Sequence, residues 1–193
     1  LDAAYRGFRE RYLGYDELTA QIQAWAEGMP EVVRLTSLAR TPEGREVWFL
    51  EIGRDPDRIR PAAWIDGNIH ASELCGSSVC LHIVEELLRA FAGAPLVDLP
   101  AHVRELLCQD VLFYVLPRMC PDGAERVLTR HHFVRSNWRE ARPANHGPYW
   151  RHDDVDGDGL SLLMRVPDPT GDFVASAEVA GLMLPRRVED EGP

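Results

Sequence analysis

The chain lacks any apolar run of about 20 residues, the length that a membrane-spanning helix needs. It also lacks a surplus of positive charge, because 21 lysines and arginines stand against 31 aspartates and glutamates, for a formal net charge of -10. Nucleic acids and anionic membranes repel such a surface, so neither is expected as a partner. Leu1 is preceded by no methionine or signal-like apolar core, and we therefore expect a processed or trimmed product.

Paired cysteines are missing as well. The four cysteines form no CxxC pair, and the spacing from Cys75 to Cys80 does not suit a zinc knuckle. Together with Cys108 and Cys120 they stand in apolar stretches, where a free thiol behaves as a small hydrophobic side chain. We expect buried thiols, with a disulfide as the alternative, and neither arrangement fixes the redox compartment.

The remaining composition, 45% hydrophobic and 27% charged over 193 residues, is ordinary for one globular domain. Hydrophobic periodicity predicts helices at 15–28, at 72–91 (with Leu74, Val79, Ile83 and Leu87 toward the core) and at 102–108. It predicts a hairpin at 32–53 around the turn Thr41–Arg45, a buried central strand at 61–68, and a strand at 111–117 followed by a turn at 120–123. This alternation favours an α/β fold with a mixed β-sheet flanked by helices.

The regular periodicity ends near Trp138, where Pro, Gly, Asp and Asn accumulate. We therefore expect residues 1–140 to be the N-terminal part of a catalytic domain, and 141–193 to be a loop-rich acidic insertion and tail of the same domain.

A histidine and a glutamate three residues apart can share one cation if the chain turns between them. The pattern is not specific here, because it occurs three times: His70–Glu73, His82–Glu85 and His102–Glu105. The second and third copies fall inside expected helices, where a surface pair is the simpler interpretation. His70 instead follows an expected strand and a turn at Gly67, where ligands gather in open α/β sheets. Glu73 would open the next helix and Ser72 would cap it, yet these features leave a metal site and an ordinary turn both open.

The segment WIDGNIHASEL, which holds His70 and Glu73, resembles the stretch with the first two zinc ligands in the carboxypeptidase A-like zinc metallocarboxypeptidases. The similarity is ordered over about the first 140 residues. It includes the leading helix and hairpin with the Thr41–Arg45 turn, the stretch VLFYVLPRMCPDGAERVL, and the stretch HHFVRSNWR. One departure is Cys120, where the family usually has asparagine. We therefore interpret the chain as the N-terminal portion of such a catalytic domain.

The resemblance implies a zinc carboxypeptidase-like α/β/α sandwich, incomplete at its C-terminus, that hydrolyses the C-terminal peptide bonds of peptides and proteins. It implies that His70 and Glu73 bind zinc, which would activate a water and polarise the scissile carbonyl. A carboxylate would act as general base. The oxyanion-stabilising arginine of the family falls on Arg135. A surface salt bridge is the alternative role for this side chain.

Other parts of the family's site have no matching residue. The third zinc ligand is a later histidine, but His146 and His152 lie in a Pro/Gly/Asp-rich stretch without a strand pattern. Asn137–Arg139 is only superficially similar to the pair that binds the substrate carboxylate. We expect the third ligand and the general base beyond Pro193.

The acidic loop at Asp154, Asp156 and Asp158 matches the first half of an EF-hand calcium loop, with glycine at the sixth position. The twelfth position should be a bidentate glutamate and is Arg165, so a solvated turn is the simpler interpretation. The stretch DDVDGDGLSLLMRVPDPTGD nevertheless resembles an insertion in some bacterial members of the family, which leaves a calcium role open.

Two other functions stay open. A zinc-dependent deacylase of the aspartoacylase or succinylglutamate desuccinylase kind also uses HxxE and a later histidine, although the N-terminal hairpin and the Arg135 segment argue for the peptidase. A non-catalytic truncated module fits a chain without its remaining ligands. The sequence gives neither oligomeric state nor compartment; the resemblance favours a secreted or periplasmic protein.

Overall fold

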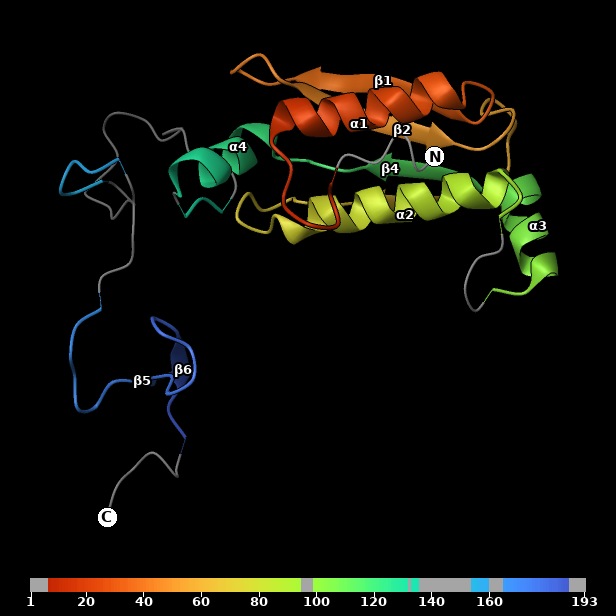
Figure 1. Cartoon of the computed structure of the whole chain (residues 1–193). Coiled ribbons are helices and arrows are strands. Elements are labelled where there is room, and N and C mark those ends of the chain that lie inside the picture. The colour runs from red at the N-terminus through yellow and green to blue at the C-terminus, as the bar shows by residue number, and fades with distance from the viewer. Residues whose placement is uncertain (1–6, 95–98, 132, 136–153, 160–164, 188–193) are drawn as a thin grey trace. The chain divides into compact units, whose positions relative to one another are not determined.

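The computed structural model of the chain describes residues 7–94, 99–131, 133–135, 154–159 and 165–187. They belong to two compact units, residues 1–162 and 163–193, each of which is described by itself. The helices of the first unit are α1 (Tyr15–Gly28), α2 (Cys75–Phe91), α3 (Ala101–Asp110) and α4 (Pro121–Arg130) (Figure 1). Its strands are β1 (Val33–Arg40), β2 (Glu46–Ile52), β3 (Ala62–Asp66) and β4 (Leu112–Leu116).

The four strands form one sheet in the order β1-β2-β4-β3. β1 and β2 are an antiparallel hairpin, β2 and β4 are antiparallel, and β3 runs parallel to β4, so the predicted mixed sheet with flanking helices is confirmed. The predicted turn closes the hairpin through a hydrogen bond from Gly44 N to Thr41 O of 2.9 Å, and Gly44 has a φ of 84°. The prediction of a buried central strand at 61–68 is wrong for the described sheet, because β3 forms its edge and alternates between exposed and half-buried residues.

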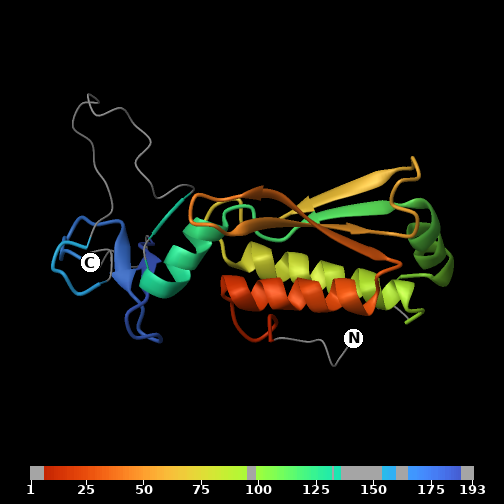
Figure 2. The same ribbon diagram turned by 90° about the horizontal axis from the view of Figure 1, so that it is seen from above.

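α1 and α2 both lie against the same face of the sheet (Figure 2). The residues between them form the core; its fully buried side chains include Leu18, Ile22, Trp25, Leu50, Ile52, Leu81, Val84, Leu88 and Val115. The opposite face carries an aromatic cluster in which the Phe49 ring lies 5.5 Å from both Tyr114 and Trp64. Alternation along β2 and β4 produces this division, because neighbouring residues of a strand point to opposite faces.

The long helix α2 differs from its prediction in both its start and its buried face. It begins at Cys75 rather than at residue 72, and Val79 is 54% exposed instead of facing the core. The buried positions are Ser77, Cys80, Leu81, Val84, Glu85, Leu88 and Ala90. Two of them are polar and have partners elsewhere in the chain: Ser77 bonds to Asn68, and Glu85 pairs with Arg9. Leu87 of the predicted stripe does pack against the core, but the hydrophobic pattern alone missed the positions that are fully buried.

The remaining elements confirm some predictions and correct others. α3 and β4 appear as predicted, whereas the expected turn at 120–123 is the first turn of α4, with Pro121 at a position where a missing N–H costs nothing. In the second unit, β5 (Phe173–Ala175) pairs with β6 (Met183–Pro185) in an antiparallel hairpin that the sequence did not predict. The boundary expected near residue 141 lies outside the described residues, so the division into 1–140 and 141–193 stays a prediction.

All four cysteines are free thiols. Cys80 is buried, as expected, but Cys75 is exposed at the start of α2, and Cys108 and Cys120 are intermediate. The prediction of uniformly buried thiols is therefore wrong for Cys75. Among the described helices, none has the length and hydropathy to cross a membrane.

Candidate metal centre

His70 and Glu73 lie in the segment that connects the carboxyl end of β3 with α2, as their placement in the sequence predicted. The segment turns twice, because Glu73 N donates to His70 O at 3.0 Å and Gly76 N donates to Glu73 O at 3.1 Å. Glu73 precedes the helix instead of opening it, and Ser72 does not cap it, since the N-cap residue is Leu74 without a side-chain cap. Both details of the sequence prediction are therefore wrong, while the strand-turn-helix setting is right.

Two glycines let this segment pack directly against the first turn of α2. A Cβ atom on Gly67 would lie 2.7 Å from Cys80 Sγ and even nearer to the carbonyl oxygen of Gly76. A Cβ atom on Gly76 would lie 2.7 Å from the backbone nitrogen of Asn68. The left-handed turn itself belongs to Asn68, whose φ is 53°, and not to Gly67 as the sequence suggested.

A chain of buried, hydrogen-bonded polar side chains supports the segment that carries His70 and Glu73. Asn68 Nδ2 donates to the carbonyl oxygens of His70 at 2.7 Å and of Ala71 at 3.2 Å. Asn68 Oδ1 accepts from Ser77 Oγ at 3.2 Å, and Ser77 Oγ accepts from Arg118 Nε at 3.1 Å. Arg118 is buried, and burial lowers the pKa of its guanidinium to about 10. Sequence reasoning missed all three side chains, although an asparagine after a glycine at a strand end is a signal for a left-handed turn.

The two candidate ligands point toward each other. Nδ1 of His70 lies 2.9 Å from Oε1 of Glu73, and their side chains are 29% and 60% exposed. One imidazole nitrogen and one carboxylate oxygen are donors that zinc accepts, and two ligands of one tetrahedral zinc ion lie roughly 3.4 Å apart. The pair therefore fits part of a zinc site after a small outward movement. A complete protein site needs at least one further ligand.

The other two HxxE pairs are in different surroundings. His82 and Glu85 lie on α2, where Nη2 of Arg9 is 3.0 Å from His82 Nδ1 and also contacts Glu85 and Glu86. An arginine cation thus already pairs with both carboxylates. The third pair, His102–Glu105, lies on α3 with both residues exposed. The interpretation as a helix-surface pair agrees with the structure for His102–Glu105 but is wrong for the other copy, because Glu85 is buried.

The Arg135 segment lies beside the candidate ligands. Ala71 N donates to Arg135 O at 2.6 Å, and Ser72 N donates to Val134 O at 3.0 Å. The Arg135 residue is exposed, which leaves its guanidinium accessible. The structure thus brings His70, Glu73 and Arg135 into one region, whereas their roles stay predictions. His146, His152 and Asn137–Arg139 lie outside the described residues.

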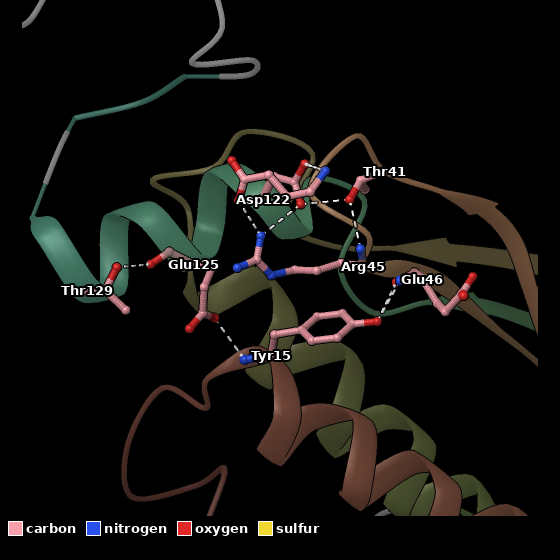
Figure 3. Close-up of polar contacts among 8 residues, drawn as sticks. Tyr15, Thr41, Arg45, Glu46, Asp122, Glu125 and Thr129 are labelled. Carbon is pink, nitrogen blue, oxygen red and sulfur yellow. Dashed lines mark hydrogen bonds and ion pairs between the residues drawn. The ribbon is translucent and has the colours of Figure 1, made fainter.

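A second polar network joins the hairpin turn to α4 (Figure 3). The buried Asp122 carboxylate accepts from Thr41 Oγ1 at 2.7 Å and from Arg45 Nη1 at 2.9 Å. On the same helix, Glu125 accepts from the backbone nitrogen of Tyr15 at 2.9 Å. α4 is therefore attached to the hairpin and to α1, and the loop before it is attached to the candidate metal centre, since Cys120 N donates to Asn68 O at 3.2 Å.

The acidic loop has its own compact geometry. Asp154 accepts from the backbone nitrogens of Gly157 and Gly159 at 2.7 and 2.8 Å. These bonds, that from Gly159 first, hold the pKa of Asp154 below its usual value. One carboxylate oxygen from each of Asp154, Asp156 and Asp158 lies within 4.8 Å of the others. Such a turn satisfies its own backbone without an ion, and exposed acidic groups are common without one.

A mixed sheet with a His and Glu pair at the carboxyl end of one strand fits part of a metal site, and comparison with known proteins assigns the family. The sequence profile of the zinc carboxypeptidase family matches residues 18–158. The chain belongs to this family.

Its relatives show how much of a whole enzyme is present. The zinc carboxypeptidase of Saccharothrix mutabilis subsp. capreolus is 27% identical over 143 residues, 72% of this chain and 31% of that protein. Carboxypeptidase A6 of Homo sapiens is 30% identical over 129 residues, 65% of this chain and 27% of that protein. The chain thus spans about a third of the length of these relatives. The crystal structure of carboxypeptidase A from Helicoverpa armigera shares the fold, with a TM-score of 0.60 at 20% identity over 72% of this chain and 32% of that one.

Proposed function

We propose that the protein to which this chain belongs is a zinc-dependent metallocarboxypeptidase that removes C-terminal residues from peptides and proteins. The observation that supports this most is the His70–Glu73 pair, with its Nδ1 and Oε1 atoms 2.9 Å apart at the carboxyl end of β3. It lies beside Arg135 and belongs to a chain of the zinc carboxypeptidase family.

In this proposal His70 and Glu73 would hold a zinc ion. When bound, the ion would polarise the scissile carbonyl of the substrate and activate a water molecule. The chain's own residues contribute position and charge. Asn68 fixes the carbonyl groups of His70 and Ala71, so that the imidazole is directed toward Glu73 before any metal arrives. The Arg135 side chain is exposed and its backbone contacts the ligand segment, and in this proposal its guanidinium stabilises the oxyanion that forms when the scissile carbonyl is attacked. The third ligand and the general base belong to the rest of the protein.

The test uses the full-length protein and measures its zinc content together with hydrolysis of a peptide. His70→Ala is expected to lower the zinc content from one ion to well below half an ion and to abolish hydrolysis, because one ligand is removed. His102→Ala, an exposed histidine of another HxxE pair, is the matched control and is expected to retain both. Normal zinc content in His70→Ala would show that the site lies elsewhere.

The substrate class is tested on the same protein. We expect release of C-terminal amino acids from peptides and no release of acyl groups from N-acyl amino acids. The reverse preference would favour the deacylase, and neither activity in a zinc-loaded protein would favour the non-catalytic module.

Two further expectations are part of the proposal. Calcium at Asp154, Asp156 and Asp158 has no support from the relatives and rests on the loop sequence, so terbium luminescence with and without Asp156→Asn is its test. An exported location, secreted or periplasmic, rests on the family resemblance, and fractionation of the source cells checks it.

A further inference from the structure

Ser72, between the two candidate ligands, makes most of the contact with the Arg135 segment. Its backbone nitrogen donates to Val134 O at 3.0 Å, and its hydroxyl donates to the same oxygen at 2.6 Å. The hydroxyl also accepts from Val134 N at 3.2 Å. Ser72 thus takes part in three hydrogen bonds to Val134, and a further one joins Ala71 N to Arg135 O.

The Arg135 segment is held by these bonds rather than by a helix or strand of its own. α4 ends at Arg130, and His131 follows in a left-handed conformation with a φ of 52°. Residues 133–135 form no helix or strand. Val134 is 8% exposed, so its N–H and C=O are shielded from water and need partners within the protein. The Ser72 hydroxyl provides a partner for both.

We propose that Ser72 is a positioning residue for the reaction, whose hydroxyl sets the place of Arg135 relative to the His70–Glu73 pair. This inference rests on the proposed function. Since Ser72 lies two residues after His70 and directly before Glu73, a single short segment holds the metal ligands and also anchors the arginine. Loss of the hydroxyl would remove its two hydrogen bonds to Val134 and keep the backbone bonds of Ala71 and Ser72, so both ligands stay in place while the arginine segment loosens.

The expected effect is on the chemical step. Arg135 interacts with charge that appears only in the transition state, so its displacement lowers kcat and leaves KM and zinc content nearly unchanged. Because the backbone bonds remain, we expect partial displacement of the arginine and a fall in kcat of about tenfold, which is about 1.4 kcal/mol of transition-state stabilisation. A direct loss of an oxyanion donor costs more, about 100-fold or above.

The experiment compares variants of the full-length, zinc-loaded protein. Ser72→Ala removes the hydroxyl, Ser72→Thr retains it, and Ser78→Ala is a matched control on the half-buried side of α2. We expect about a tenfold loss of kcat in Ser72→Ala, most of it restored in Ser72→Thr, and none in Ser78→Ala. In an Arg135→Ala background, Ser72→Ala is expected to have no further effect, because the residue it positions is already gone.

A second measurement does not depend on activity. Amide hydrogen exchange at Val134 and Ala71 is expected to quicken in Ser72→Ala and to stay at the wild-type rate in Ser72→Thr and Ser78→Ala. Equal kcat losses from Ser72→Ala with and without Arg135 would overturn the inference, as would unchanged exchange at Val134. If the wild-type protein does not hydrolyse peptides, the proposed function fails, and the exchange rates alone decide whether Ser72 holds the segment.

Discussion

Gly67 gives a sharp test of how the candidate metal centre is built. In Gly67→Ala the new methyl group would lie 2.7 Å from Cys80 Sγ, 2.7 Å from the Gly76 carbonyl carbon and nearer still to its oxygen. Two of these three atoms are backbone in the first turn of α2, so rotation of a side chain cannot relieve the clash. β3 and α2 must move apart by several tenths of an ångström. We expect a loss of about 3 kcal/mol, the upper part of the usual range for overpacking.

The same displacement moves the ligands, because residues 67–76 are the segment that carries them. Gly67→Ala is therefore expected to lower zinc affinity as well as stability. Urea denaturation of the full-length protein followed by tryptophan fluorescence measures the first, and zinc competition with a chromogenic chelator measures the second.

The matched control is Gly28→Ala, at the last residue of α1, where a Cβ atom meets nothing within 4 Å. It is expected to be neutral or to stabilise the protein by up to about 1 kcal/mol, since alanine is the better helix former. A Gly67→Ala protein as stable as wild type, or a Gly28→Ala protein that loses as much, would refute the reasoning.

Two other predictions concern groups outside the metal centre. Asp122→Ala is expected to cost about 3 kcal/mol in urea denaturation, because it leaves the half-buried Arg45 without its buried partner, whereas the exposed Asp57→Ala should cost almost nothing. Burial raises the pKa of Cys80 to about 11, so at pH 8 iodoacetamide should label Cys75 and spare Cys80. Because the folded thiol pKa is raised, its contribution to stability is complete below the ordinary pKa of 9.0 and declines as pH rises toward 11. Rapid labelling of Cys80 in folded protein would contradict its burial.

The local sequence pattern was sufficient to predict the elements that depend only on residues near one another in the sequence. α1 occupies the predicted range, Tyr15–Gly28, and buries Leu18, Ile22 and Trp25 at helical spacing. The hairpin also follows from adjacent strands around a glycine turn. Both cases need only short-range information, since periodicity and turn chemistry are encoded within about ten residues of one another.

Most of the wrong predictions concern features that depend on contacts between residues far apart in the sequence. The buried face of α2 includes Ser77 and Glu85, which are acceptable there because Arg118 and Arg9 supply partners from far along the chain. The edge position of β3 depends on strand order, which no local pattern contains. The β5–β6 hairpin was missed because three-residue strands have too few positions to show alternation.

The candidate site shows the same division between local and distant information. The HxxE spacing occurs three times, and only the surroundings distinguish the copies. In the His82–Glu85 copy both side chains contact an arginine, and the His102–Glu105 copy is exposed on α3. The segment of His70–Glu73 is instead held by a chain of buried, hydrogen-bonded polar side chains. That chain ends in Arg118, and burying a guanidinium costs free energy unless hydrogen bonds offset it. Its bonds to Ser77 and to the Leu13 carbonyl offset part of that cost, although Nη1 has no hydrogen-bond partner, and they tie the ligand segment to the loop before α1. The bonds that hold the segment are made by protein groups alone, so metal binding need not supply all of the free energy of ordering it.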